Sequence, residues 1–437
     1  MVTLTRRELL AALSAGAALA GCSSGPGPVP QTPWEPQEPL DADAFPSGVQ
    51  VGDATDSGAI VSVRAPQAAA TLRLARATDA GWVEERLDAP LSFSDRVAQH
   101  SLVDLRADTT YAVVAITSDG AARSAVAQLR TALAPGASRR LRFAATSCLG
   151  GSTPWASLSH AAALELDAFL LLGDTIYADW GQGDVEAHWD AALTTQGLLD
   201  VFARTSIVAT WDDHEVGNNW DPASPADQAL AQAARVAYRR ALPQGVGPTG
   251  GIWRSLRWGD AAELFVLDCR GERQGSSYVS AEQLSWLIDG LITSPARFKI
   301  VLNSVPITDF SAFGNPGRIG EEDRWQGYPE QRTELLTRLH DAAVPGLLWV
   351  AGDFHVGGVL HVDADGGVGA DMREVLVGPG GSPISNRYDL VPETGPIEAI
   401  VREWNTVVLE LDPNSGWVTV VFVGDDGGEL RRLILQL

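Results

Sequence analysis

Apolar and polar residues follow two different rhythms along this chain, and the change falls near residue 135. Before it, short alternating segments are separated by turn residues, a pattern typical of half-buried antiparallel strands. After residue 140, apolar runs alternate with amphipathic stretches of helical period. The pattern predicts a small all-β domain over residues 46–135, a break at Ala134-Pro135-Gly136-Ala137, and a larger α/β domain over residues 140–437.

The first domain is predicted to be an antiparallel β-sandwich. Its clearest strands are residues 59–63, 71–75 and 111–116. Tyr111 follows Leu105 and Thr109 at the spacing of a tyrosine corner, so the segment resembles a fibronectin III-like sandwich. We find no set of catalytic residue types in it, and we expect a packing or spacer role.

The second domain is predicted to alternate strands and helices. The expected strands are residues 141–146, 168–172, 206–210, 264–267, 299–302 and 347–351. The expected helices are residues 154–166, 185–204, 226–241, 330–343 and one that opens at Ser280 with a capping box. Three later segments, residues 375–377, 406–411 and 417–423, indicate consecutive strands. We therefore expect a layered α/β domain whose sheet turns antiparallel toward the C-terminus.

The first 22 residues have the pattern of an export signal. A twin-arginine sequence at residues 5–10 precedes an apolar run, residues 9–20, that is too short to span a bilayer. Leu19-Ala20-Gly21-Cys22 then resembles a lipobox, which predicts lipidation of Cys22. The alternative is an ordinary secretory signal with an incidental cysteine. Residues 23–45, rich in Ser, Gly and Pro, are predicted to be a flexible linker, so we expect a periplasmic or cell-surface lipoprotein held to a membrane by its lipid.

Composition excludes some classes of function. The chain has 437 residues, of which 45% are hydrophobic, as in folded globular proteins. Its formal net charge of −23 repels phosphate backbones, so no nucleic-acid partner is expected. Metal ions in a cleft can nevertheless reverse the local potential and admit a small anionic substrate. Besides Cys22, only Cys148 and Cys269 are present, and one disulfide between them is an open alternative.

Reactive residue types follow five of the predicted strands. They are Ser147-Cys148, Gly173-Asp174 with Tyr177, Asp212-Asp213-His214-Glu215, Asn303-Ser304 and Gly352-Asp353-Phe354-His355. A single Asp after a strand is commonly a turn or helix cap. Sites in open α/β sheets form outside the carboxyl ends of the strands, and five such ends point to a multinuclear metal site.

The order of these segments resembles the calcineurin-like metallophosphoesterases, and more closely their PhoD-type alkaline phosphatase branch. The resemblance runs from about residue 48 to the C-terminus and implies an αββα sandwich behind the β-domain. Cys148, Asn303 and Asp353 stand where the broader family has other ligand types, and these are the PhoD-type substitutions. Two positions depart from that branch: Ser304 replaces an expected Gln, and Cys269 replaces an expected Thr.

The resemblance implies Fe³⁺ and Ca²⁺ as cofactors. The implied iron ligands are Cys148, Asp174, Tyr177 and His355. The implied calcium ligands are Asp213 and Asp353, with Asp174 bridging. Thiolate and phenolate suit trivalent iron, whereas carboxylate oxygens suit Ca²⁺.

The implied chemistry is phosphoester hydrolysis. A metal-bound hydroxide or oxide is expected to attack phosphorus while His214, oriented by Glu215, donates a proton to the departing alkoxide. Candidate substrate-binding residues are Asn218, Asn303 and Arg270. For Asn218 loop capping is equally expected, and for Arg270 an ion pair with Asp268 or Glu272 is the preferred alternative. Three tryptophans are expected to flank the rim: Trp180, Trp211 and Trp220.

Three functions compete. The leading one is an exported alkaline phosphatase or phosphodiesterase acting on a small-molecule, lipid or polymer phosphoester. A phospholipase D-like phosphodiesterase on the same fold is the nearest alternative. The third is an inactive surface binding lipoprotein, against which the intact set of candidate ligands argues.

Overall fold

The structure is a computed structural model that describes residues 32–66, 69–151, 154–180, 184–310, 323–386, 393 and 395–437. The predicted signal with Cys22, and the linker up to residue 31, lie outside these residues. Among the described helices, none has the length and apolar character that crossing a membrane requires. The twin-arginine signal and the lipid anchor remain predictions.

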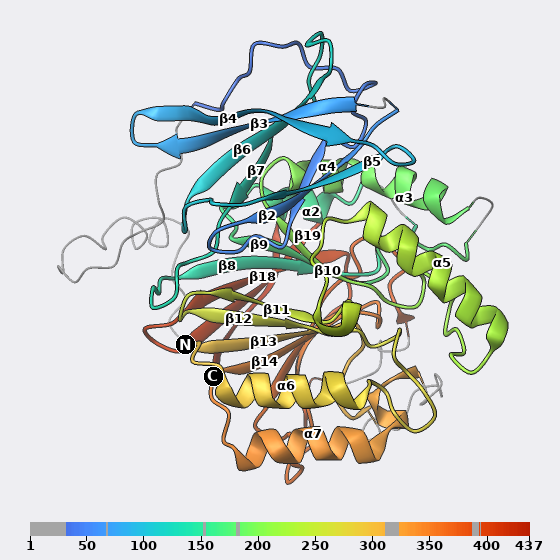
Figure 1. Ribbon diagram of the computed structural model, residues 1–437. Coiled ribbons are helices and arrows are strands. Elements are labelled where there is room, and N and C mark those ends of the chain that lie inside the picture. Colours follow the sequence, from blue (N-terminus) through green and yellow to red (C-terminus); the bar gives the residue numbers. More distant parts are fainter. Residues whose placement is uncertain are drawn as a thin grey trace.

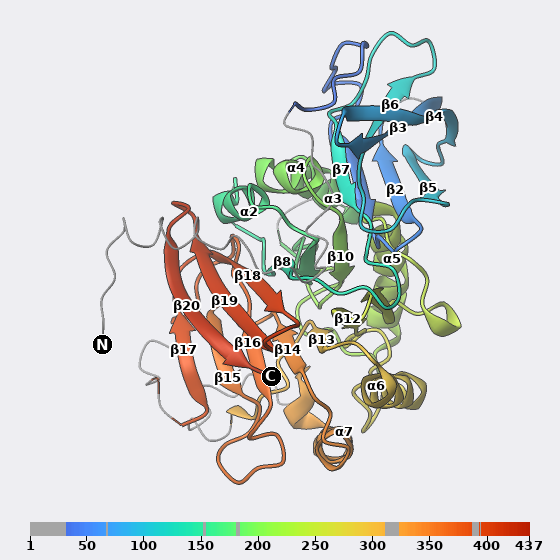
Figure 2. The same ribbon diagram turned by 90° about the vertical axis from the view of Figure 1, so that its left-hand side faces the viewer.

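Two large sheets pack face to face (Figures 1 and 2). The nine-stranded sheet has the order β20 (Glu429–Gln436), β19 (Trp417–Gly424), β18 (Asn405–Asp412), β8 (Leu141–Thr146), β9 (Ala168–Leu172), β10 (Ile207–Thr210), β1 (Val49–Gly52), β2 (Ala59–Arg64), β5 (Val97–Leu102). The seven-stranded sheet has the order β11 (Arg254–Trp258), β12 (Ala262–Val266), β13 (Phe298–Asn303), β14 (Leu347–Ala351), β16 (Arg373–Leu376), β15 (Gly357–His361), β17 (Ile397–Val401).

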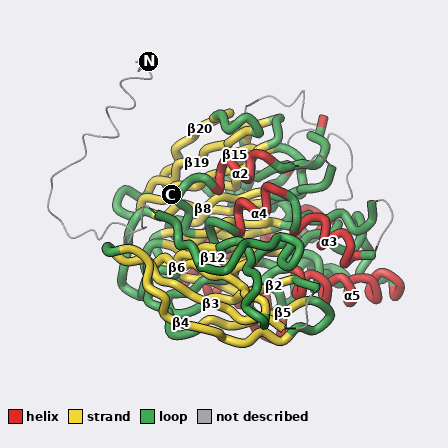
Figure 3. The backbone as a smooth tube through the Cα atoms, turned by 90° about the horizontal axis from the view of Figure 1, so that it is seen from above, coloured by secondary structure: helices red, strands yellow, loops and turns green. Residues whose placement is uncertain are grey.

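Helices cover the outer faces of both sheets. Those on the nine-stranded sheet are α2 (Ala156–Ala162), α3 (Val185–Leu193), α4 (Gln196–Phe202) and α5 (Pro225–Ala241), which form a row when viewed from above (Figure 3). Those on the seven-stranded sheet are α6 (Ala281–Thr293) and α7 (Pro329–Asp341). The expected four-layer α/β arrangement is therefore present.

Strand β9 shows why the sequence forms these layers. Leu170 and Leu172 point into the core between the sheets, and Phe169 and Leu171 point into the core under the helices. The sequence of a strand that is buried on both faces is continuously apolar, as residues 168–172 are. β8, β9 and β10 are parallel neighbours, so the residues that follow them emerge at one edge.

The N-terminal sandwich joins the larger domain more closely than the sequence predicts. Its four-stranded sheet has the order β4 (Gly81–Ser92), β3 (Ala69–Thr78), β6 (Thr110–Thr117), β7 (Ala127–Arg130), and it packs on β1, β2 and β5. The Tyr111 hydroxyl accepts a hydrogen bond from the backbone N–H of Arg106 at 2.8 Å, as a tyrosine corner requires. However, β1 pairs in parallel with β10. The two domains therefore share one continuous sheet. Asp53, just past β1, also forms a buried ion pair with Arg254 of β11 at 2.6 Å.

Several predicted elements differ from the observed ones. The helix predicted over residues 185–204 is two helices, because the hydroxyls of Thr194 and Thr195 bond back to the carbonyl of Ala191 and interrupt the helix. The helix predicted from residue 154 begins only after Trp155, whose φ of 59° is left-handed. The strands that were not predicted include β1, β4, β5 and β7 in the first domain and β11, β17 and β20 in the larger domain. The last is mostly exposed.

Candidate functional site

The loops after β8, β9, β10 and β14 bring the predicted ligands to one place. Cys148, Asp174, Asp353 and His355 all have left-handed backbones, with φ between 53° and 68°. Such conformations cost non-glycine residues free energy, and they persist where the surrounding structure enforces them, typically at functional sites. The local fold thus maintains strain to aim these four side chains.

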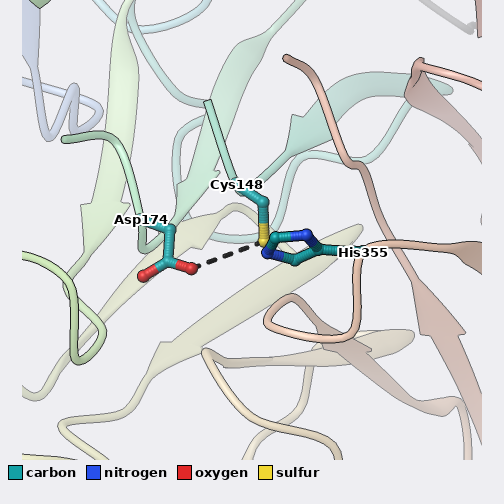
Figure 4. A group of neighbouring side chains, drawn as sticks. All are labelled: Cys148, Asp174 and His355. Carbon is teal, nitrogen blue, oxygen red and sulfur yellow. Dashed lines mark hydrogen bonds between the residues drawn. The ribbon is translucent and has the colours of Figure 1, made fainter. Parts of the chain in front are cut away.

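Asp174 is shared by three groups of donor atoms, and within each group the atoms lie within 4.8 Å of one another. The first group is Cys148, Asp174 and His355; the second is Asp174, Asp213 and His214; the third is Asp174, Asp212, Asp213 and Asp353. Figure 4 shows the first group, in which the Cys148 thiol donates to Asp174 Oδ2 at 3.6 Å. Asp174 therefore lies where a bridging ligand would stand if neighbouring groups each held a metal ion.

Tyr177 completes the first group. Its hydroxyl donates to Asp174 Oδ2 at 3.2 Å, lies 3.2 Å from His355 Nε2, and accepts a hydrogen bond from Ser382 at 2.6 Å. His355 Nδ1 lies 2.7 Å from the carbonyl oxygen of Pro383. Because that contact requires the proton on Nδ1, Nε2 carries the lone pair that faces Asp174 and Tyr177.

The site concentrates negative charge that the protein does not fully neutralise. Burial, reinforced by neighbouring acidic groups, raises the pKa of Asp174, Tyr177 and Asp353 well above their usual values. Burial likewise raises the pKa of the Cys148 thiol to about 12. Asp213 Oδ1 is buried without a hydrogen-bond partner. Multivalent cations would remove both deficits, and thiolate, phenolate, imidazole and carboxylate donors are ordinary metal ligands, so the residues fit a metal centre.

His214 lies beside this centre and is held by a residue that sequence reasoning missed. Its Nδ1 is 2.7 Å from Asp179 Oδ1, and its ring packs on Tyr177 with centroids 4.1 Å apart. Asp179 also accepts from the backbone N–H of Asn218 at 3.1 Å. The signal was present in the sequence, because Asp179 follows Tyr177 by two residues in the same loop.

The donor groups open into a cleft of about 530 Å³. Asp174, Asp213, His214, Asp353 and His355 line it together with Asn218, Asn219, Asp323, Trp180, Phe354, Ile384, Ser385 and Asn386. The cleft thus combines the candidate metal-ligating groups with the apolar side chains of Trp180, Phe354 and Ile384. Trp211 and Trp220, predicted beside Trp180 at the rim, are instead buried.

The sequence matches the PhoD-like phosphatase family over residues 186–425, more than half of the chain. The chain belongs to the PhoD-like phosphatase family. Alkaline phosphatase D of Bacillus subtilis (strain 168) is 25% identical over 325 residues, which are 61% of this chain and 56% of that protein. The match thus spans little more than half the length of this curated relative.

Solved structures place the fold. The structure described as that of PhoD has a TM-score of 0.73 and 20% identity over 90% of this chain and 89% of its own. Purple acid phosphatase PPD1 from yellow lupin (Lupinus luteus) seeds has a TM-score of 0.63 and 14% identity over 89% of this chain and 74% of its own. These likenesses show a metallophosphoesterase-like α/β fold.

Glu215 in this PhoD-like chain does not orient His214, contrary to the prediction. Its carboxylate accepts hydrogen bonds from the backbone N–H groups of Asp174 at 3.1 Å, Thr175 at 2.7 Å and Asp212 at 2.8 Å. Burial raises its pKa to about 8. Glu215 therefore ties the loops after β9 and β10 together, while Asp179 holds His214.

Arg270 also differs from both of its predicted roles. It is fully buried and does not line the cleft, and it pairs with Asp212 and Asp323 rather than with Asp268 or Glu272. Its Nη2 is buried without a hydrogen bond, 3.8 Å from both Asp213 Oδ1 and Asp353 Oδ1. Arg270 thus supports the ligands from within the protein and is not placed to clamp a substrate.

Asn303 and the cysteines complete the comparison with the prediction. Asn303 is buried behind the cleft wall, where its Oδ1 accepts from Cys269 Sγ at 2.9 Å and from Trp325 Nε1 at 3.2 Å. Cys148 and Cys269 are both free, so the alternative of a disulfide between them is wrong. The substitution of Thr by Cys269 leaves a side chain that bonds Asn303.

Proposed function

We propose that this chain is a metal-dependent phosphoester hydrolase, an alkaline phosphatase or phosphodiesterase. The observation that carries the proposal is the position of Asp174, whose carboxylate belongs to three adjoining donor groups beside His214. Membership of the PhoD-like phosphatase family supports the same reaction. An inactive binding protein would have no need to maintain strained, buried and under-neutralised ligands.

Two kinds of donors support two kinds of metal. Cys148, Tyr177 and His355 with Asp174 suit Fe³⁺, and Asp213 and Asp353 with Asp174 suit Ca²⁺. When bound, such ions supply positive charge for the phosphate oxygens and acidify water at neutral pH.

The protein's own groups handle the leaving alcohol. Asp179 holds Nδ1 of His214, so Nε2 of the same ring is available as the proton donor. Nε2 delivers the proton to the ester oxygen while the bond between that oxygen and phosphorus breaks. Glu215 acts at a distance, because its backbone hydrogen bonds fix the loops that carry Asp174 and Asp213. Asn218, on the cleft wall, is the predicted substrate-binding residue that remains positioned for the role.

The predicted export signal and Cys22 lipidation would place this activity at a membrane surface outside the cytoplasm. That placement rests on the sequence of the first 22 residues. A phospholipase D-like activity would then have its substrate beside the site.

The test is hydrolysis of p-nitrophenyl phosphate, bis-p-nitrophenyl phosphate and phosphatidylcholine by the purified protein, with metal analysis of the same sample. We expect turnover of at least one ester, bound iron and calcium, and loss of both metals and turnover in Asp174→Asn. Bound metal without turnover of any ester would contradict the proposed reaction. Full metal content in Asp174→Asn would contradict the bridging role.

A further inference from the structure

Trp180 is a large apolar side chain left exposed at the edge of a charged cleft. It keeps 41% of its surface accessible to solvent, whereas Trp211 and Trp220 are buried. An exposed indole gains free energy when a flat apolar group covers it. Single exposed apolar side chains are common on protein surfaces, but this one borders the cleft, where a bound ligand could cover it.

Contacts with its neighbours fix the ring of Trp180 beside the reacting groups. Its centroid lies 4.1 Å from that of Tyr177 and 5.6 Å from that of His214, with the His214 ring edge-on at 69°. Tyr177 is itself hydrogen-bonded to Asp174. Trp180 is thus in contact with the proposed proton donor, so an alcohol protonated by His214 would leave within reach of the indole.

A second hollow adjoins the same indole. Trp180 borders the metal cleft and also a hollow of about 290 Å³. The apolar residues lining that hollow are Leu149, Trp155, Ile176, Tyr177, Ala191 and Ala192. A space with largely apolar and aromatic walls thus adjoins the acidic cleft at Trp180.

We infer that Trp180 and this hollow form a subsite for a planar aromatic alcohol, so that the preferred substrates are phosphoesters of aromatic leaving groups. The inference rests on the proposed function, because it assigns the leaving-group side from His214. Stacking on one aromatic side chain changes affinity by about 10-fold, and more where the ring is well covered. We expect that factor in the preference for aromatic over small aliphatic groups.

Binding of inert analogues tests the subsite without turnover. Calorimetry compares phenylphosphonate with methylphosphonate on metal-loaded wild type, Trp180→Ala, Trp180→Phe and Trp417→Ala. Trp417 is the matched control, since it is 48% exposed and lines a different cavity. We expect the phenyl-to-methyl affinity ratio to fall about 10-fold in Trp180→Ala, to be largely retained in Trp180→Phe and to be unchanged in Trp417→Ala.

Kinetics with phenyl phosphate and methyl phosphate separate this inference from the proposed function. The subsite alone would be overturned by two results together: the wild type hydrolyses both esters, and Trp180→Ala keeps the phenyl-to-methyl affinity ratio of the wild type. An equal drop in that ratio in Trp417→Ala would also overturn it. Wild type that binds phenylphosphonate through Trp180 but hydrolyses no ester would overturn the proposed function and leave an aromatic binding site.

Discussion

The pairing of His214 with Asp179 predicts how the reaction depends on its leaving group. The two side chains are joined at 2.7 Å and are mostly buried, with 10% and 24% of their surfaces exposed. A hydrogen bond to a charged group is worth about 1.5–3 kcal/mol. At about 1.36 kcal/mol per factor of ten, Asp179→Asn should lower kcat by about 10- to 150-fold, and His214→Ala by about 10²- to 10⁴-fold.

These losses should appear only where the leaving oxygen needs a proton. An alkyl phosphate releases a basic alkoxide, whereas p-nitrophenyl phosphate releases an anion that is stable without protonation. We therefore expect the full loss of kcat with a simple alkyl phosphate and a much smaller loss with p-nitrophenyl phosphate, for both variants. Asp200→Asn is the control, because Asp200 lies on the exposed face of α4 and bonds Gln196.

Metal analysis of every sample is needed, because His214 belongs to one of the donor groups. If both substrates lose activity equally while iron and calcium stay at wild-type levels, His214 is not the proton donor. If Asp179→Asn has the wild-type kcat with the alkyl ester, the 2.7 Å contact does not position the imidazole for catalysis.

Three further predictions concern the metals and the anchor. Cys148→Ser should lose iron, the colour of thiolate-to-iron charge transfer, and turnover, whereas Cys269→Ser should keep all three. Metal analysis and visible absorption measure these properties. Retained iron in Cys148→Ser would refute the assignment of Cys148 as an iron ligand. Chelation should leave a protein whose free energy of unfolding falls as pH rises from about 4 to 8. The folded-state pKa values of Asp212, about 6, and Glu215, about 8, exceed their unfolded values near 4, so stability present at low pH is lost as these groups ionise. Denaturant titrations at several pH values measure the free energy of unfolding. A rise of that free energy from about pH 4 to 8 would contradict the prediction. Cys22→Ser should release the protein from membranes without changing kcat, and persistent membrane association in fractionation would exclude the lipid anchor.

The sequence was sufficient to predict the parts of the site that local patterns encode. Asp174 and Asp213 each follow a buried parallel strand, so their meeting at one edge was predictable from the rule that sites form at the carboxyl ends of such strands. The direction in which a side chain points within a loop is not encoded in that way. Glu215 is next to His214 in the chain, yet its carboxylate turns to the backbone of Thr175, and Asp179 reaches His214 from another loop. Only the folded loops distinguish these two carboxylates.

The predicted domain boundary shows the same limit at a larger scale. Turn residues near position 135 mark where one pattern ends, but they carry no information about which strands pair across it. β1 pairs with β10, and the buried ion pair next to this pairing joins Asp53 to Arg254, which is 201 residues away in the sequence. A strand's neighbours in a sheet are set by such distant contacts.

Arg270 occupies one oxygen of a carboxylate in the third donor group. Four aspartates meet in the third donor group, and all four are buried or nearly so. Asp212 Oδ1 accepts hydrogen bonds from Arg270 Nε and from the Ser304 hydroxyl, the latter at 3.0 Å. The Ser304 that departs from the expected Gln thus helps hold Asp212 on Arg270. Arg270 shares its single charge between Asp212 and Asp323, and Asp212 Oδ2 is buried without a hydrogen-bond partner. Multivalent ions would therefore be needed where all four aspartates converge.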